Sequence, residues 1–176
     1  MPQSSLHLIR VRRKPGNKSR GWLLAGPLAI PVAIGRSGIM ANKREGDGGT
    51  PRGCFHLVRL WWRADRWPRP QTMLPTRPIR PRDGWCEDPA DRHYNQPIRL
   101  PESSTADHLA RADRLYDYII ELDHNTRPRI AGRGSAVFIH IARENFGPTA
   151  GCVALRFDRL QKLLAQLGPQ TRIDIR

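Results

Sequence analysis

Alternating apolar and polar positions dominate the first third of the chain. The pattern covers residues 6–11, continues on both sides of Gly26-Pro27, and returns in CFHLVRLWW at residues 54–62. A period of two is typical of half-buried β-strands, and a Gly-Pro pair marks a turn. The pattern therefore predicts β-structure with a hairpin around Gly26-Pro27. The glycines and proline of KREGDGGTPRG, residues 43–53, predict a structured loop between these strands.

Prolines interrupt every periodic pattern in the middle of the chain. They recur between residues 63 and 101, in stretches such as RWPRPQTMLPTRPIRPRDGW. Neither a helix nor a central strand can continue there, because proline has no backbone N–H to donate. A loop of this length in a compact domain is usually functional or disordered, and its interspersed Trp and Tyr residues favour a packed cover. We therefore expect residues 63–101 to form a lid over a substrate site.

Helical spacing of apolar residues occurs near the C-terminus, before the stop signal Gly168-Pro169. It predicts one amphipathic helix against a sheet, built on Phe157, Leu160, Leu163, Leu164 and Leu167. Other expected elements are a short helix within 103–114, strands at 116–122 and 135–142, and an edge strand in the final TRIDIR. With 176 residues, the chain fits a single domain over residues 1–176, mainly β with some α.

The basic residues 10–20 and the apolar WLLAGPLAIPVAIG that follows could be taken for a signal peptide. Gly26-Pro27 and Pro31 interrupt this apolar run, which also starts late, so we interpret it as two strands around a turn. No stretch approaches the ~18 uninterrupted apolar residues of a membrane helix. We expect a soluble chain with no transmembrane segment and no visible export signal.

The chain is strongly basic, with 30 Lys and Arg residues against 16 Asp and Glu residues and a net charge of +14. Such a charge favours polyanionic or acidic partners and says nothing about the fold. Nucleic acid, an anionic membrane surface and a cell-wall polymer with free carboxylates would all suit it, and composition does not separate them. Only the chemistry of a candidate site can distinguish between these three classes of partner.

The three cysteines, Cys54, Cys86 and Cys152, form no CxxC motif and have no His pair nearby at zinc-ligand spacing. A structural zinc site is therefore disfavoured. An odd number leaves at least one thiol free. A Cys54–Cys86 disulfide stays open, although two small, semi-buried thiols are the favoured interpretation.

The segment FIHIARENFGPTAGC places His140 on a strand and Cys152 after a Gly147-Pro148 loop. The loop can return Cys152 to the end of the strand, where an imidazole can take the proton of the thiol. Gly151 removes side-chain bulk and would let the N–H groups of residues 151 and 152 face a developing oxyanion. These features favour acyl transfer, but a buried histidine beside an inert core cysteine is the commoner arrangement.

These residues resemble the signature of the L,D-transpeptidase catalytic (YkuD) domain family: an upstream His, a spacer, then Ser/Thr-His-Gly-Cys. His140 and Thr149-Ala150-Gly151-Cys152 match it, the segment 50–55 resembles a TPxGxF-type motif, and GSAVFIH, 134–140, resembles the strand of the family's base. The similarity covers roughly residues 6–176. It implies a β-sandwich of mixed sheets, with long proline-rich loops and one C-terminal helix.

The resemblance also implies an activity. Family members form a thioester between the catalytic cysteine and a diaminopimelate carbonyl of a peptidoglycan stem peptide, then pass the acyl group to an amine of a neighbouring stem. By resemblance, Cys152 is the nucleophile and His140 the base, oriented by a backbone carbonyl. Thr149 shapes the pocket, and Gly151 with Cys152 supplies the oxyanion hole. The resemblance implies no cofactor or metal, and a periplasmic location because the substrate lies there.

Two departures from the family pattern stand next to the nucleophile. Ala150 replaces the usual histidine, and Ala154 replaces the usual Arg or Asn. The spacer between His140 and Cys152 is also short. These changes put the usual tetrapeptide specificity in doubt more than the thiol chemistry, and a linkage through another residue of the stem is conceivable.

Substrate contacts are expected from two regions. Arg143 suits a substrate carboxylate, because a guanidinium binds one with two hydrogen bonds. Four lid residues would form a wall of the site: Trp85, Asp88, Tyr94 and Asn95. A solvated charge and surface-loop packing explain these residues about as well. Arg44, Glu45 and Asp47 are expected to brace the glycine-rich loop rather than contact substrate.

Two alternatives remain beside the transpeptidase. An L,D-carboxypeptidase or endopeptidase would use the same dyad with water as acceptor. A basic nucleic-acid-binding domain would stack bases on Trp61, Trp62 and Trp67, which arginines surround. The charge is diffuse, however, and no known nucleic-acid motif occurs, so we expect no specific nucleic acid partner. The protein is expected to be a monomer.

Overall fold

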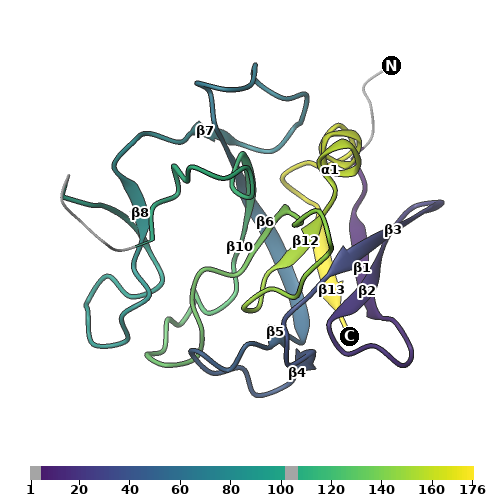
Figure 1. The fold of residues 1–176 in the computed structure, drawn as a ribbon, viewed down its shortest axis with the longest axis horizontal. Coiled ribbons are helices and arrows are strands. Elements are labelled where there is room, and N and C mark those ends of the chain that lie inside the picture. The colour runs from purple at the N-terminus through teal and green to yellow at the C-terminus, as the bar shows by residue number, and fades with distance from the viewer. Residues whose placement is uncertain (1–4, 102–106) are drawn as a thin grey trace.

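The computed structural model describes residues 5–101 and 107–176, and its framework is a set of β-strands (Figure 1). In chain order, the strands are β1 (Leu8–Arg13), β2 (Arg20–Ala25), β3 (Leu28–Ala33), β4 (Ile39–Met40), β5 (Thr50–Pro51), β6 (Gly53–Trp62), β7 (Thr76–Pro78), β8 (Asp83–Trp85), β9 (Pro97–Arg99), β10 (Tyr118–Leu122), β11 (Phe138–Ile141), β12 (Val153–Leu155) and β13 (Arg172–Ile175). One α-helix, α1 (Phe157–Leu164), is present within the described residues.

The main sheet curls around until its two ends meet. Among the described residues it has nine strands in the order β10-β11-β12-β3-β2-β1-β13-β6-β7, and β10 also pairs with β6. Strands β12 and β3 share a single residue pair, so this seam is a corner between two facing layers. The ring is mixed: β1 pairs parallel with β13 and β11 pairs parallel with β12, and its other pairs are antiparallel. The expected mainly-β sandwich of mixed sheets is confirmed.

The main core fills the space between the two layers. Every strand of the ring contributes fully buried aliphatic residues, such as Ile9, Leu23 and Ile120. Helix α1 adds Leu160, Leu163 and Leu164, all fully buried, which confirms the C-terminal amphipathic helix. Figure 1 shows α1 at the end of the molecule opposite β4 and β5. The helix therefore closes one end of the core.

The predicted hairpin around Gly26-Pro27 is confirmed. Strands β2 and β3 pair antiparallel along their whole lengths, and Gly26 takes a φ of 56° at the turn. The apolar run after the basic N-terminal residues is therefore part of the sheet. Within the described ranges, no helix is long and apolar enough to cross a membrane.

Two expectations about the second half need correction. The final strand is not an edge strand, because β13 pairs with β1 on one side and with β6 on the other. Its Ile173 and Ile175 are fully buried, which a central position explains. The helix expected within 103–114 lies partly outside the described residues, since 103–106 are not described. Residues 107–114 form irregular bends with an isolated bridge between His108 and Gly84, and the Asp113 carboxylate accepts the N–H of Leu115.

The proline-rich region forms a lobe beside the sandwich. It contains only three short strands: β7 extends the sheet next to β6, while β8 and β9 pair with each other (Figure 1). A second apolar cluster joins this lobe to the outer face of β10 and β11, through Trp61, Trp85, Ile119 and Phe138. Cys152 belongs to this cluster. The lobe thus builds one wall against the face that carries the predicted nucleophile. All three cysteines are unpaired.

Candidate active site

A cavity of about 350 Å³ opens over the start of β12 and takes in both predicted catalytic side chains. His140 and Cys152 line it, each with 8% of its surface exposed. The other lining residues come from four segments: the loop between β3 and β5 (Arg36, Lys43, Glu45, Gly46), the lobe (Glu87), residues 107–116 (Asp107, Arg111, Leu115, Tyr116) and the surroundings of β11 and β12 (Ser135, Ala136, Val137, Arg143, Gly147, Thr149, Ala150, Gly151, Ala154).

His140 is held with one ring nitrogen ready to accept a proton. It lies in β11, opposite Ala154 of β12. Its Nδ1 donates to the carbonyl oxygen of Ile141 at 2.9 Å, so Nδ1 carries the hydrogen and Nε2 has a free lone pair. The edge of the Tyr116 ring packs on the imidazole, with 5.3 Å between ring centroids. The backbone carbonyl predicted to orient the base is therefore that of Ile141.

Cys152 lies on the same face as His140. Because β11 and β12 are parallel with Ile139 opposite Val153, Cys152 comes opposite Phe138, two positions before His140. Its Sγ donates to the Ala136 carbonyl at 3.2 Å and accepts the Phe138 N–H at 3.4 Å. No hydrogen bond joins the sulfur to the imidazole in this structure. The thiol must therefore turn from Ala136 towards Nε2 before it reacts, as is common in unliganded catalytic sites.

Burial keeps both groups neutral at rest. It raises the pKa of Cys152 to about 12, opposed in part by the Phe138 N–H and by Lys43. It lowers the pKa of His140 to about 4, with a further contribution from Arg111 and Arg143. The proton stays on sulfur, and the imidazole is a free base at neutral pH. The pair is thus suited to general-base activation of the thiol rather than to a preformed ion pair.

The turn before Cys152 is closed by the Thr149 side chain. Its hydroxyl donates to the Cys152 carbonyl at 2.6 Å and accepts the Gly151 N–H at 3.1 Å. Thr149 therefore shapes the nucleophile loop. The Gly151 N–H thus has an acceptor within its own loop, and the oxyanion hole formed by the N–H groups of Gly151 and Cys152 stays a prediction.

The cavity carries charges of both signs. Four basic side chains line it, Arg36, Lys43, Arg111 and Arg143, together with three acidic ones, Glu45, Glu87 and Asp107. Arg143 lies here as predicted, and its guanidinium has no partner among the described residues. This mixture suits a substrate that has both carboxylates and amines. Among the described residues, no three His, Cys, Asp or Glu side chains gather as metal ligands would.

Comparison with protein-family models matches residues 19–175 to YkuD, the L,D-transpeptidase catalytic domain. This match covers nearly the whole chain. The chain belongs to the L,D-transpeptidase catalytic domain family. The comparison with curated proteins found no significant match, and the comparison with solved structures found none either.

The four lid residues expected to bind substrate do not line the cavity of this L,D-transpeptidase domain. Trp85 packs edge-on against Phe138, with 5.0 Å between centroids, and Tyr94 donates to the Glu45 carboxylate. Asp88 is exposed and accepts the Ala90 N–H. These contacts stabilise the lobe against the domain, so packing explains the residues better than substrate binding.

Asn95 supports the nucleophile indirectly. Its Oδ1 accepts the Trp85 indole N–H and the Ala136 N–H, both at 3.1 Å. Ala136 has a φ of 51°, which is unusual for a residue with a side chain, and its carbonyl accepts the Cys152 thiol. Asn95 therefore helps to fix the carbonyl that positions the resting thiol.

The glycine-rich loop is braced largely as expected. The Asp47 carboxylate accepts the N–H groups of Arg44 at 2.7 Å and Gly49 at 2.8 Å. Glu45 accepts the Ser135 hydroxyl at 2.8 Å and also lines the cavity. The loop is thereby tied to the segment that leads into β11.

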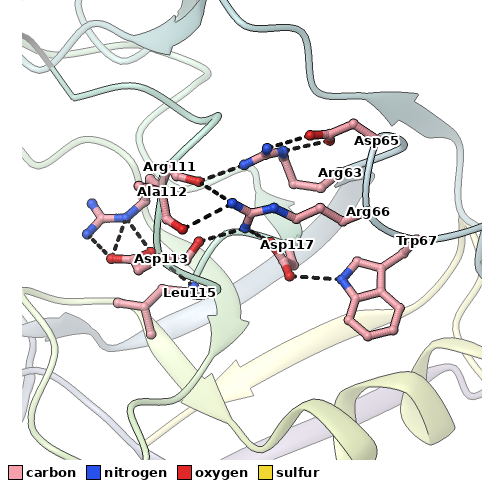
Figure 2. Close-up of polar contacts among 9 residues, drawn as sticks. All are labelled: Arg63, Asp65, Arg66, Trp67, Arg111, Ala112, Asp113, Leu115 and Asp117. Atoms are coloured by element: carbon pink, nitrogen blue, oxygen red, sulfur yellow. Dashed lines mark hydrogen bonds and ion pairs between the residues drawn. The ribbon is translucent and has the colours of Figure 1, made fainter.

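The wall formed by residues 111–117 is fastened by two arginines from the turn after β6 (Figure 2). The Arg63 guanidinium donates to the Arg111 carbonyl at 2.6 Å. Arg66 donates to the carbonyls of residues 111, 112 and 113, and to the Asp117 carboxylate at 2.7 Å. The Trp67 indole donates to the other Asp117 oxygen at 2.8 Å. These contacts, which we call the arginine clamp, hold the segment that brings Arg111 and Tyr116 to the cavity.

Breaking the clamp is expected to loosen this wall. Asp117 is 1% exposed, and an Arg66→Met change removes its only ion-pair partner among the described residues. A buried carboxylate without its cation costs about 3 kcal/mol or more, so we expect a lower free energy of unfolding and a raised KM. Denaturant unfolding with acyl-transfer kinetics measures both. The control is Arg69→Met, an exposed arginine of the same region; equal stability of the two variants would contradict the clamp.

Gly151 cannot be replaced without moving the loop beside it. Its φ of 149° disfavours a side chain, and a Cβ there would lie 2.8 Å from the Gly49 carbonyl oxygen. We expect Gly151→Ala to lower acyl transfer about a hundredfold and stability by about 3 kcal/mol. The matched control is Gly16→Ala, where φ is 75° but nothing lies within 4 Å. If both variants lose the same stability in thermal unfolding, the contact with Gly49 does not constrain the site.

Sequence reasoning did not single out Lys43, Glu87, Arg111 and Tyr116 as residues of the cavity. Lys43 opens the glycine-rich loop, and Tyr116 stands two positions before the first residue of β10. These positions are visible in sequence, but their approach to Cys152 depends on tertiary contacts between distant segments.

Proposed function

We propose that the protein is an L,D-transpeptidase that crosslinks peptidoglycan stem peptides through a thioester on Cys152, with His140 as general base. One observation supports it above all: within an L,D-transpeptidase catalytic domain, a thiol and an imidazole with a free Nε2 line the same cavity. Neither group has a purely structural partner that would prevent the reaction. The Ala136 carbonyl holds the thiol only at 3.2 Å.

The reaction follows from this arrangement. Sγ attacks the donor carbonyl carbon while Nε2 of His140 takes the thiol proton, and the carbonyl electrons move to oxygen. The intermediate collapses, the C–N bond breaks, and the leaving amine departs with the proton from His140. An acceptor amine then attacks the thioester and gives a proton to His140, which returns it to the leaving sulfur.

The charges of the cavity support a peptide substrate with free ammonium and carboxylate groups. Diaminopimelate stems carry both. Arg143 is available for a carboxylate, and Glu45, Glu87 and Asp107 offer partners for an amine. The same three carboxylates disfavour a polyphosphate in this cavity, which weakens the nucleic-acid alternative.

The test is incubation with purified muropeptides, followed by mass spectrometry. Protein whose thiols have been blocked beforehand is the control. New dimers support the transpeptidase, whereas shortened monomers alone would assign the hydrolytic variant of the same dyad. Unchanged muropeptides, together with DNA binding that weakens steeply with salt, would overturn the proposal in favour of a nucleic-acid-binding domain.

We also propose that the reaction takes place in the periplasm, because the donor strands lie outside the cytoplasmic membrane. The net charge of +14 suits a cell wall rich in carboxylates. Fractionation of cells that produce the tagged protein tests this, and recovery only with cytoplasmic markers would contradict it.

A further inference from the structure

Lys43 is a buried cation in the wall of the catalytic cavity. Only 7% of it is exposed, and it lines the same cavity as Cys152. A buried charge is retained at a cost unless it has partners or a role. Its partner is Asp47, which accepts from Nζ at 2.5 Å.

Two glycines make the channel in which this side chain lies. A Cβ at Gly134 would be 3.0 Å from Lys43 Cγ, and a Cβ at Gly151 would be 3.6 Å from Cε. The lysine stem therefore passes between the segment before β11 and the residue before the nucleophile. Side chains at these two positions would crowd it. The absence of side chains at Gly134 and Gly151 leaves space for Lys43 to extend along the cavity wall.

The ammonium has one donor left. Nζ carries three N–H bonds; one goes to the Arg44 carbonyl at 2.7 Å and one to Asp47. No third acceptor for it occurs among the described residues. Asp47 is itself held by the N–H groups of Arg44 and Gly49, so the ammonium is fixed in place.

The side chains of the nucleophile loop offer no free donor for the charge that develops, because the Thr149 hydroxyl already donates to the Cys152 carbonyl. The Gly151 N–H bonds to Thr149, and the neighbouring Ala150 and Ala154 have apolar side chains. Charge that forms in a buried site needs a preorganised partner. We propose that the Lys43 ammonium, positioned by Asp47, is that partner, and that it stabilises first the thiolate of Cys152 and then the oxyanion of the tetrahedral intermediate.

This inference deepens the proposed function, but its effect on the thiol is independent of the substrate. Besides Lys43, the charged and titratable groups that face the thiol are His140 on β11, Tyr116 and Arg111 from the clamped segment, and Glu87 of the lobe. Glu45, Asp107, Arg36 and Arg143 complete the cavity. The tests therefore change Lys43 alone and leave these groups in place.

The first test is the rate at which iodoacetamide alkylates Cys152, followed from pH 6 to about pH 10 by peptide mass spectrometry. A positive charge in the same buried cavity favours the thiolate, so Lys43→Met should slow alkylation about tenfold at about pH 8. Lys43→Arg, which keeps the charge, should stay within about threefold of wild type. Lys162→Met, an exposed lysine of α1, is the control with the same charge change.

A folded Lys43→Met protein that is alkylated at the wild-type rate would overturn the proposal. If this variant melts before it can be measured, Lys43→Gln takes its place under the same criterion. A merely structural lysine would lower the melting temperature without shifting the pH profile, and this too would refute the inference.

Acyl transfer separates this inference from the proposed function. Suppose that Lys43→Met is alkylated more slowly and that even the wild type yields no muropeptide product. This result would support the role of Lys43 at the thiol and refute the proposed transpeptidase activity. If the wild type crosslinks muropeptides but Lys43→Met has unchanged alkylation and unchanged kcat, the transpeptidase activity is supported and the role of Lys43 is refuted.

Discussion

The Cys152→Ala variant is expected to form no thioester and no crosslinked product, with a rate at least ~10³-fold below wild type. No other described thiol can replace it. Cys86 is buried outside the cavity, and Cys54 is exposed on β6. Mass spectrometry of the intact protein after incubation with a donor muropeptide measures the acyl adduct directly.

The matched control is Cys54→Ser, which changes an exposed thiol and should keep full activity. The fold of Cys152→Ala should survive, because alanine loses only one sulfur atom and its two weak hydrogen bonds, to Ala136 and Phe138. A Cys152→Ala protein that still produces dimers would exclude Cys152 as the nucleophile.

Prediction from sequence succeeded where the chemistry depends on local order along the chain. Strand alternation puts Phe138 and His140 on one face, and a single loop returns Cys152 to the neighbouring strand, opposite Phe138. The hairpin of β2 and β3 and the spacing of leucines in α1 are equally local. The fold class and the approach of His140 and Cys152 to one cavity could therefore be predicted from the sequence, whereas their catalytic roles stay a prediction.

Predictions from sequence patterns were wrong where the position of a strand or the orientation of a side chain depends on contacts with distant segments. The sequence pattern of the final strand is the same for an edge strand and for a central strand. Its pairing with both β1 and β6 shows that the strand is central. Trp85 and Asn95 belong to the lobe as expected, but long-range contacts turn them towards Phe138 and Ala136 rather than towards the cavity. Lys43 reaches the site for the same reason.

The pH dependence of the reaction should report the burial of His140. Burial lowers its pKa from the ordinary 6.5 to about 4, so the base stays neutral throughout the physiological range. We expect the limb of kcat/KM that His140 causes to lie near pH 4, well separated from any effect of Glu87, a cavity carboxyl whose pKa burial raises to about 7. His140→Gln, which cannot accept the proton, should lose about 10² to 10⁴ in kcat/KM. An acid limb near pH 6.5 that persists in Glu87→Gln would show that the base is solvated instead.

The same burial makes stability depend on pH in a defined direction. The unfolded chain binds a proton at this imidazole below pH 6.5, whereas the folded protein does so only below about pH 4. The contribution of His140 to the free energy of unfolding is therefore fully present above pH 6.5. It is lost as the pH falls towards 4, by about 3 kcal/mol in all. Denaturant unfolding across this window should show a steeper loss for wild type than for His140→Gln. Parallel curves would mean that the imidazole is not buried as a neutral group, and the assignment of Nε2 as a free base would fall with it.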